Sequence, residues 1–126
     1  MRTFLFPLTL LTLSILSASC TKELKYTKEE LLFKALKADP SVTIVLPKSM
    51  TEGVSCSDYS DGCLSAHIVK VKDLEFIGVE FMTEADAIYA AKKFRGYYTR
   101  NWLWDDVTGE PILEKFVTES LEAKKP

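Results

Sequence analysis

The stretch LEFIGVEFMTEADA, residues 74–87, decides which fold the sequence predicts. Leu74 to Met82 is the most hydrophobic run outside the N-terminal segment, as is typical of a strand in the middle of a sheet. Gly78 interrupts this run, and a glycine inside a strand indicates a bulge or a closely approaching neighbour. Thr83 to Asp86 then has the composition of a helix start. We therefore expect a central strand that leads directly into a helix.

The segments that follow extend this unit toward the C-terminus. Apolar residues recur at helical spacing up to Phe94, and Gly96 marks the end of that helix. The aromatic stretch from Tyr97 to Trp104 predicts one further strand. Pro111 fits the first turn of a last helix.

The residues before Leu74 predict one helix and two strands. Thr27 and Glu30 have the spacing of a capping box, and Asp39-Pro40 ends the helix that they start. Short strands are predicted at 42–46 and 64–72. The whole pattern predicts a single α+β domain over residues 27–126, with an antiparallel sheet of about four strands and helices packed on one face.

The stretch from Leu74 to Trp104 resembles the second half of a ferredoxin-like sandwich. Its strand at 76–81 and helix start at 83–87 are similar to those of the RNA-recognition motif and of the bacterial SPOR domain. The SPOR domain binds peptidoglycan, so the second resemblance implies peptidoglycan as a partner. The first half of the chain departs from both families, because no helix is predicted between the strands at 42–46 and 64–72.

The N-terminal segment has the order of a secretory signal peptide. Met1-Arg2 is positive, Phe4 to Leu16 is apolar, and the small residues 17–19 follow. The apolar run is shorter than the roughly 20 residues that a membrane-spanning helix needs. We therefore expect residues 1–19 to be removed on export.

Leu16-Ser17-Ala18-Ser19-Cys20 resembles a bacterial lipobox. The resemblance implies a mature lipoprotein that begins at Cys20, carries acyl chains there and is tethered by residues 20–26. Thr21, in place of Asp, implies the outer membrane with the domain facing the periplasm. The family usually has Leu where this chain has Ser17, so ordinary signal-peptidase cleavage, giving a periplasmic or secreted protein, stays open.

The other two cysteines, Cys56 and Cys63, form an even pair in an exported protein, which predicts a disulfide. A zinc site is the competing interpretation, but His67 is the one further ligand nearby. The disulfide would close the end of a long loop over residues 48–62. Such a loop is either functional or a flexible segment that the disulfide restrains.

Few residues suggest catalysis or a cofactor. His67 is the single histidine, and no serine lies in a Gly-x-Ser-x-Gly motif. We expect His67 to be structural, with a hydrolase that uses it as the alternative. The acidic stretch 58–62 lacks the regular spacing of a calcium loop, so no metal site is predicted. The formal net charge of −2 gives no reason to expect nucleic acid as a partner.

The aromatic strand is the strongest candidate for a binding surface. In a continuous strand Tyr98, Arg100, Trp102 and Trp104 share one face. If exposed, they would form a platform for sugar rings or a peptide, with Arg100 available for a carboxylate. The alternative is that both tryptophans belong to the core.

Together these patterns predict a non-enzymatic envelope protein, anchored in the membrane through its lipid. Its expected partner is peptidoglycan or another envelope protein. The alternative is a structural or oligomeric component of the envelope.

Overall fold

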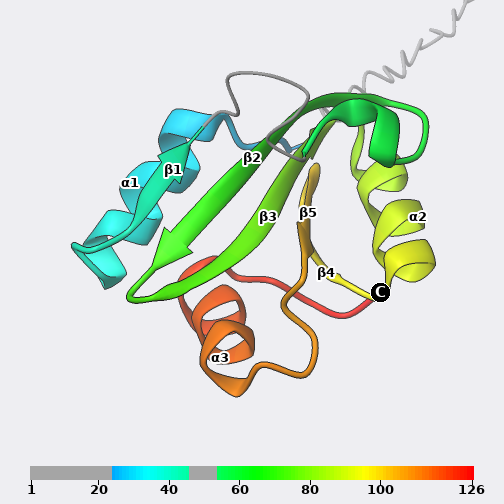
Figure 1. Ribbon diagram of the computed structural model, residues 1–126. Coiled ribbons are helices and arrows are strands. Elements are labelled where there is room, and N and C mark those ends of the chain that lie inside the picture. Colours follow the sequence, from blue (N-terminus) through cyan, green and yellow to red (C-terminus); the bar gives the residue numbers. More distant parts are fainter. Residues whose placement is uncertain (1–23, 46–53) are drawn as a thin grey trace, which may run out of the picture.

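The computed structural model describes residues 24–45 and 54–126 (Figure 1). Its elements are α1 (Lys28–Ala38), β1 (Thr43–Val45), the short 3-10 helix η2 (Cys56–Asp58), β2 (Cys63–Val71), β3 (Leu74–Phe81), α2 (Glu84–Phe94), β4 (Tyr97–Thr99), β5 (Trp102–Asp105) and α3 (Pro111–Ser120). The predicted signal peptide, Cys20 and the first part of the predicted loop lie outside the described residues. The predicted α+β class is confirmed.

Five strands form the sheet, in the order β1-β2-β3-β5-β4, and all neighbours are antiparallel. β3 lies in the middle, as the sequence predicts. The strand–helix–strand order predicted for residues 74–104 is present. The gap between β3 and β4 is filled by β5, which follows β4 in the chain.

The single strand predicted at 97–104 is wrong, since this segment is a hairpin. Thr99 pairs with Trp102, and Arg100 and Asn101 form the turn between β4 and β5. Arg100 takes a positive φ of 51°, which a non-glycine residue seldom adopts. The hairpin adds the fifth strand.

The helices cover both faces of the sheet, which corrects the prediction of one covered face (Figure 1). α1 and α3 pack on the face that carries Phe76, Trp102 and Trp104. α2 packs its alanines on the opposite face, against residues such as Val79 and Leu103. Buried residues on both faces of β3 and β5 therefore produce a three-layer domain.

The three predicted helix starts are confirmed, and side chains cap two of them. The Thr27 hydroxyl accepts a hydrogen bond from the Glu30 amide, and the Glu30 carboxylate accepts one from the Thr27 amide, both at 3.1 Å. Thr83 caps α2 by accepting from the Asp86 amide. These bonds satisfy amides at the start of α1 and α2 that lack a partner within the helix.

The free edge of β4 is covered by the C-terminal tail. The backbone groups of Tyr98 and Lys124 exchange two hydrogen bonds of 2.9 Å. This pairing satisfies backbone groups of the edge strand that could otherwise hydrogen-bond to a strand of another chain. Within residues 24–45 and 54–126, no helix has the length and apolarity needed to cross a membrane.

The predicted disulfide between Cys56 and Cys63 is present, with 5.5 Å between the two Cα atoms. The loop that it closes packs against the domain. The Tyr59 ring lies edge-on to Phe94 at 5.1 Å, and its hydroxyl donates to the Asp105 carboxylate at 2.7 Å. The described part of the loop is therefore held by packing as well as by the disulfide.

Replacing Cys56 and Cys63 together by serine is expected to lower the free energy of unfolding by about 2.5 kcal/mol, as chain entropy gives for a loop of this length. Urea unfolding of the oxidised protein and of the double variant measures the difference. Cys20→Ser is the control, and we expect it to leave the midpoint unchanged. Equal midpoints for all three proteins would show that packing alone holds the loop.

Candidate functional site

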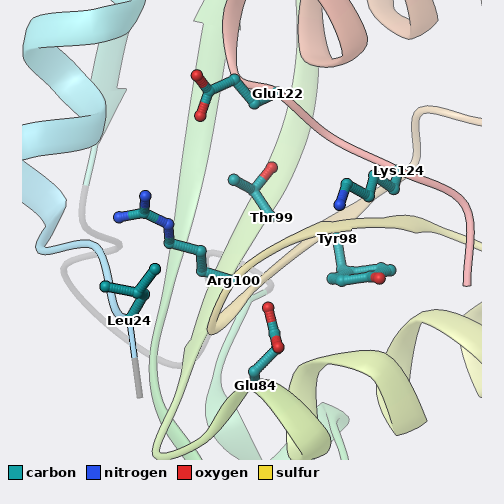
Figure 2. A pocket seen from close by; sticks show the side chains of 7 residues that line it. All are labelled: Leu24, Glu84, Tyr98, Thr99, Arg100, Glu122 and Lys124. Carbon is teal, nitrogen blue, oxygen red and sulfur yellow. The ribbon is translucent and has the colours of Figure 1, made fainter. Parts of the chain in front are cut away.

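A pocket of about 480 Å³ lies at the β4–β5 turn (Figure 2). It brings together two of the predicted binding residues, Tyr98 and Arg100. The other residues that line it come from the N-terminal segment, the start of α2, β4 and the C-terminal tail: Leu24, Glu84, Thr99, Glu122 and Lys124. The pocket is therefore assembled from segments far apart in the sequence.

Asn101 fixes the turn that carries Arg100. Its side chain is buried, accepts a hydrogen bond from the Tyr26 amide at 2.9 Å and donates one to the Phe81 carbonyl at 3.2 Å. Its own carbonyl accepts from the Phe81 amide at 2.8 Å. One side chain thus joins the turn, the end of β3 and the N-terminal segment that leads to Leu24.

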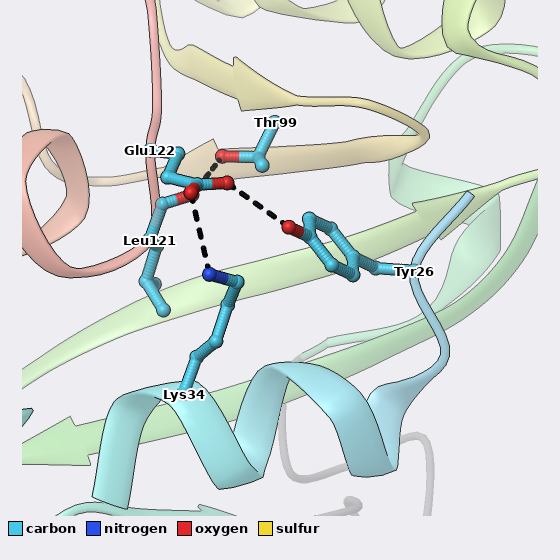
Figure 3. Close-up of polar contacts among 5 residues, drawn as sticks. All are labelled: Tyr26, Lys34, Thr99, Leu121 and Glu122. Atoms are coloured by element: carbon cyan, nitrogen blue, oxygen red, sulfur yellow. Dashed lines mark hydrogen bonds and ion pairs between the residues drawn. The ribbon is translucent and has the colours of Figure 1, made fainter. Parts of the chain in front are cut away.

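Polar contacts hold two residues of the pocket wall, Glu122 and Thr99, in place (Figure 3). Tyr26 donates its hydroxyl hydrogen to Glu122 at 3.0 Å, and the Lys34 ammonium lies 3.3 Å from the same carboxylate. The hydrogen bond from Tyr26, and then Lys34, lower the pKa of Glu122. Thr99 donates to the Leu121 carbonyl at 2.8 Å and holds the tail in place.

Arg100 is positioned by stacking. Its guanidinium carbon lies 3.9 Å from the centroid of the Tyr26 ring, a distance typical of a cation–π contact. This contact restricts the guanidinium beside the pocket and leaves its edge nitrogens available for hydrogen bonds. A planar donor held in this way suits a carboxylate or phosphate.

Charges of both signs line the pocket. Arg100 and Lys124 contribute cations, and Glu84 and Glu122 contribute carboxylates. The Glu122 charge is compensated within the protein by Lys34. The arrangement favours a ligand that places an anionic group near Arg100 and Lys124, with the half-buried Tyr98 ring beside it.

The two tryptophans lie outside this site, so the predicted four-residue surface is not formed. Trp102 and Trp104 are buried and stacked, with ring centroids 5.7 Å apart. The Trp102 indole donates to the Tyr26 carbonyl, and the Trp104 indole donates to the Thr99 hydroxyl. The turn at Arg100 places both on the face of Thr99, so the alternative that they belong to the core is correct.

His67 lies beside Ser65, with 2.9 Å between Nε2 and the hydroxyl oxygen. The Ser65 hydroxyl donates to Glu80 at 3.2 Å. In a catalytic triad the carboxylate bonds the second ring nitrogen of the histidine. Here Nδ1 of His67 has no partner among the described residues, and the carboxylate bonds the serine instead. The array therefore lacks the carboxylate that orients the imidazole of a catalytic triad.

Stability should fall in acid because of His67. Burial, and then the charge of Lys28, lower the pKa of His67, while Glu29 opposes them. The unfolded chain therefore takes up a proton near pH 6.5 that the folded chain resists, so stability decreases as the pH falls through this value. We expect the melting temperature to drop between about pH 7.5 and about pH 5.5, and to drop less in His67→Gln. Parallel slopes for the two proteins would assign the acid sensitivity to other groups.

Two acidic side chains of the turns at 58–62 and 105–110 accept hydrogen bonds within the protein. Asp58 accepts from the Ser55 amide, and Asp105 accepts from the Tyr59 hydroxyl. In the part of the chain that the structure describes, no group of three or more His, Cys, Asp or Glu side chains is placed to hold a metal ion.

Besides Thr99, which belongs to β4 like Tyr98, four residues line the pocket that the sequence did not mark as site residues, namely Leu24, Glu84, Glu122 and Lys124. No motif singles them out, since each lies in an ordinary polar segment and they meet through the fold alone. No protein-family model matches the chain, and no curated protein or solved structure is detectably similar to it.

Proposed function

We propose that this protein is an exported, lipid-anchored binding module of the cell envelope, with the pocket at the β4–β5 turn as its binding site. The observation that carries the proposal is the position of this pocket. Leu24, which lines it, is four residues from Cys20, the residue that the lipobox resemblance marks for acylation. The disulfide supports export, since such bonds persist in oxidising compartments.

The ligand that the pocket suits is an envelope component with an anionic group. The stacked Arg100 and the Lys124 side chain attract a carboxylate or a phosphate, and the Tyr98 ring offers an apolar surface next to them. Peptidoglycan, whose stem peptides carry carboxylates, is one component of this kind. The geometry of Ser65 and His67 supports binding rather than hydrolysis as the role of the domain.

The anchor is tested by the intact mass of protein extracted from membranes, measured with and without reduction. The expected mass is that of residues 20–126 plus acyl chains, with a gain of two hydrogens on reduction. An unacylated mature protein in the soluble fraction would overturn the anchor.

Binding is tested by co-sedimentation of the mature domain with purified peptidoglycan. We expect Arg100→Gln and Lys124→Gln to reduce the bound fraction, because each removes a cation from the pocket. Lys37→Gln is the matched control, since Lys37 lies near the C-terminal end of α1, outside this pocket. No co-sedimentation at low salt would exclude peptidoglycan as the ligand. An equal reduction of the bound fraction in Lys37→Gln would exclude the pocket as the binding site.

A further inference from the structure

We propose that the end of the domain nearest Cys20 docks directly on the lipid surface, with Leu64 and Met82 entering the interface. We call this end, defined by Lys25, Leu64, Met82 and Asn101, the tether end; the pocket at the β4–β5 turn neighbours it and is not part of it. The proposal rests on the lipid anchor proposed above. It adds an orientation and a second, non-covalent contact with the membrane.

Three large apolar side chains are exposed at the tether end or directly beside it. Leu24 is 65% exposed, and Leu64 and Met82 are each 55% exposed. Leu64 and Met82 line one shallow depression together with Lys25. Leu24 lines the neighbouring pocket with Arg100. Apolar residues that gather in this way indicate a contact surface, whereas single exposed ones are ordinary.

Hydrogen bonds show that these residues belong to one end of the sheet. The Met82 amide donates to the Gly62 carbonyl, which places the end of β3 beside the start of β2. Asn101 connects the same end of β3 to the β4–β5 turn and to the N-terminal segment at Tyr26. The tether end is thus a single surface built from four segments.

Leu64 is turned outward by an irregularity of the sheet. The register between β2 and β3 shifts between Cys63 and Ser65, so that Leu64 has no partner in the ladder. A bulge of this kind redirects the side chain at a sheet end. Exposure of this apolar side chain to water is unfavourable, and burial in a lipid interface would remove that cost.

The length of the tether sets how far this surface can lie from the membrane. Cys20 and Leu24 are separated by four peptide units, which span at most about 14 Å when fully extended. The headgroup layer on each side of a bilayer is about 5–8 Å thick. A chain anchored through acyl groups on Cys20 therefore holds Leu24 at or just above the headgroups.

The charges at the tether end predict how the docking responds to lipid composition. Lys25 is accompanied by Glu80, so the surface has no excess of one sign. Insertion of apolar side chains then drives the contact, in the way that interfacial segments bind. We expect it on neutral phosphatidylcholine vesicles, with little dependence on salt.

The test attaches residues 20–126 through the Cys20 thiol to a maleimide lipid in phosphatidylcholine vesicles that contain brominated lipid. Leu64→Trp reports on the tether end, and the emission of Trp102 and Trp104 in the parent is subtracted. The matched control is Ile112→Trp, because Ile112 is 51% exposed on α3 and lies outside the tether end. Circular dichroism confirms that both variants fold.

The added emission of Leu64→Trp is expected to shift to the blue and to lose intensity in the presence of brominated lipid. The emission of Ile112→Trp is expected to change little. Equal quenching in the two variants, or none in either, would overturn the docking. Because the attachment is chemical, this outcome is independent of whether the cell acylates Cys20, which the mass measurement decides separately.

Discussion

Replacing Trp104 by alanine is expected to lower the free energy of unfolding by about 3–5 kcal/mol, as removal of a large buried aromatic side chain usually does. Trp104 is 2% exposed, stacks on Trp102 and meets the edge of Phe76 at 6.0 Å. Its indole donates to Thr99, which in turn donates to the Leu121 carbonyl. The substitution therefore removes packing and leaves the Thr99 hydroxyl without one partner.

Chemical denaturation followed by circular dichroism measures this loss. Phe33→Ala is the control, since Phe33 is an exposed aromatic residue on α1 and its truncation should change stability by about 0.5 kcal/mol or less. A domain of this size has a total stability on the order of 5–15 kcal/mol, so Trp104→Ala would remove a large share. A loss in Trp104→Ala no greater than in the control would show that the indole does not support the core.

Gly78 shows why the sheet accepts this tryptophan. It pairs with Trp104 across β3 and β5, and a Cβ atom at Gly78 would lie 2.8 Å from the indole ring. A glycine inside a strand indicates a bulge or a close neighbour, and at Gly78 the structure has the close neighbour. The sequence pattern does not identify this neighbour, because Trp104 is 26 residues away along the chain.

Local signals in the sequence were sufficient for much of the fold. The capping residues Thr27 and Thr83 act over three residues, so both helix starts are readable. The pair Cys56 and Cys63 is separated by a turn-rich segment of the length that the bridge closes. The hydrophobic run of β3 also indicates how the sheet is covered. Such a run is typical of a strand buried on both faces, which is what α2 and α3 achieve.

The binding surface was mispredicted because of a single turn. Two-residue hairpin turns are usually recognised by Asn-Gly or Asp-Gly, and Arg100-Asn101 lacks the glycine. In a continuous strand, the alternation of side chains would place Tyr98 on the same face as the two tryptophans. With the turn, Tyr98 pairs with Leu103 and faces the α2 side of the sheet. The remaining pocket residues come together only through tertiary structure, which no local pattern encodes.

Asn101→Leu is expected to lower the free energy of unfolding by about 2–4 kcal/mol, since each buried group left without a partner costs about 1–3 kcal/mol. The Asn101 side chain is of similar size to leucine, so volume changes little. The Tyr26 amide and the Phe81 carbonyl both lose their side-chain partner. The same change frees the turn under Arg100 and the segment that carries Leu24, so ligand binding in the pocket should weaken as well.

Asn101→Asp separates the two hydrogen bonds. A carboxylate keeps the acceptor for the Tyr26 amide, loses the donor for the Phe81 carbonyl and places a charge in a buried site. Burial raises the pKa of a carboxyl, and its protonated form regains a donor, so the deficit relative to the parent should shrink as the pH falls from about 7 to about 4. Thermal melts of the parent and both variants at the two pH values measure this. A deficit in Asn101→Asp that is the same at both values would mean that the folded protein does not favour the protonated carboxyl, which would contradict a stabilising role of the donor to Phe81.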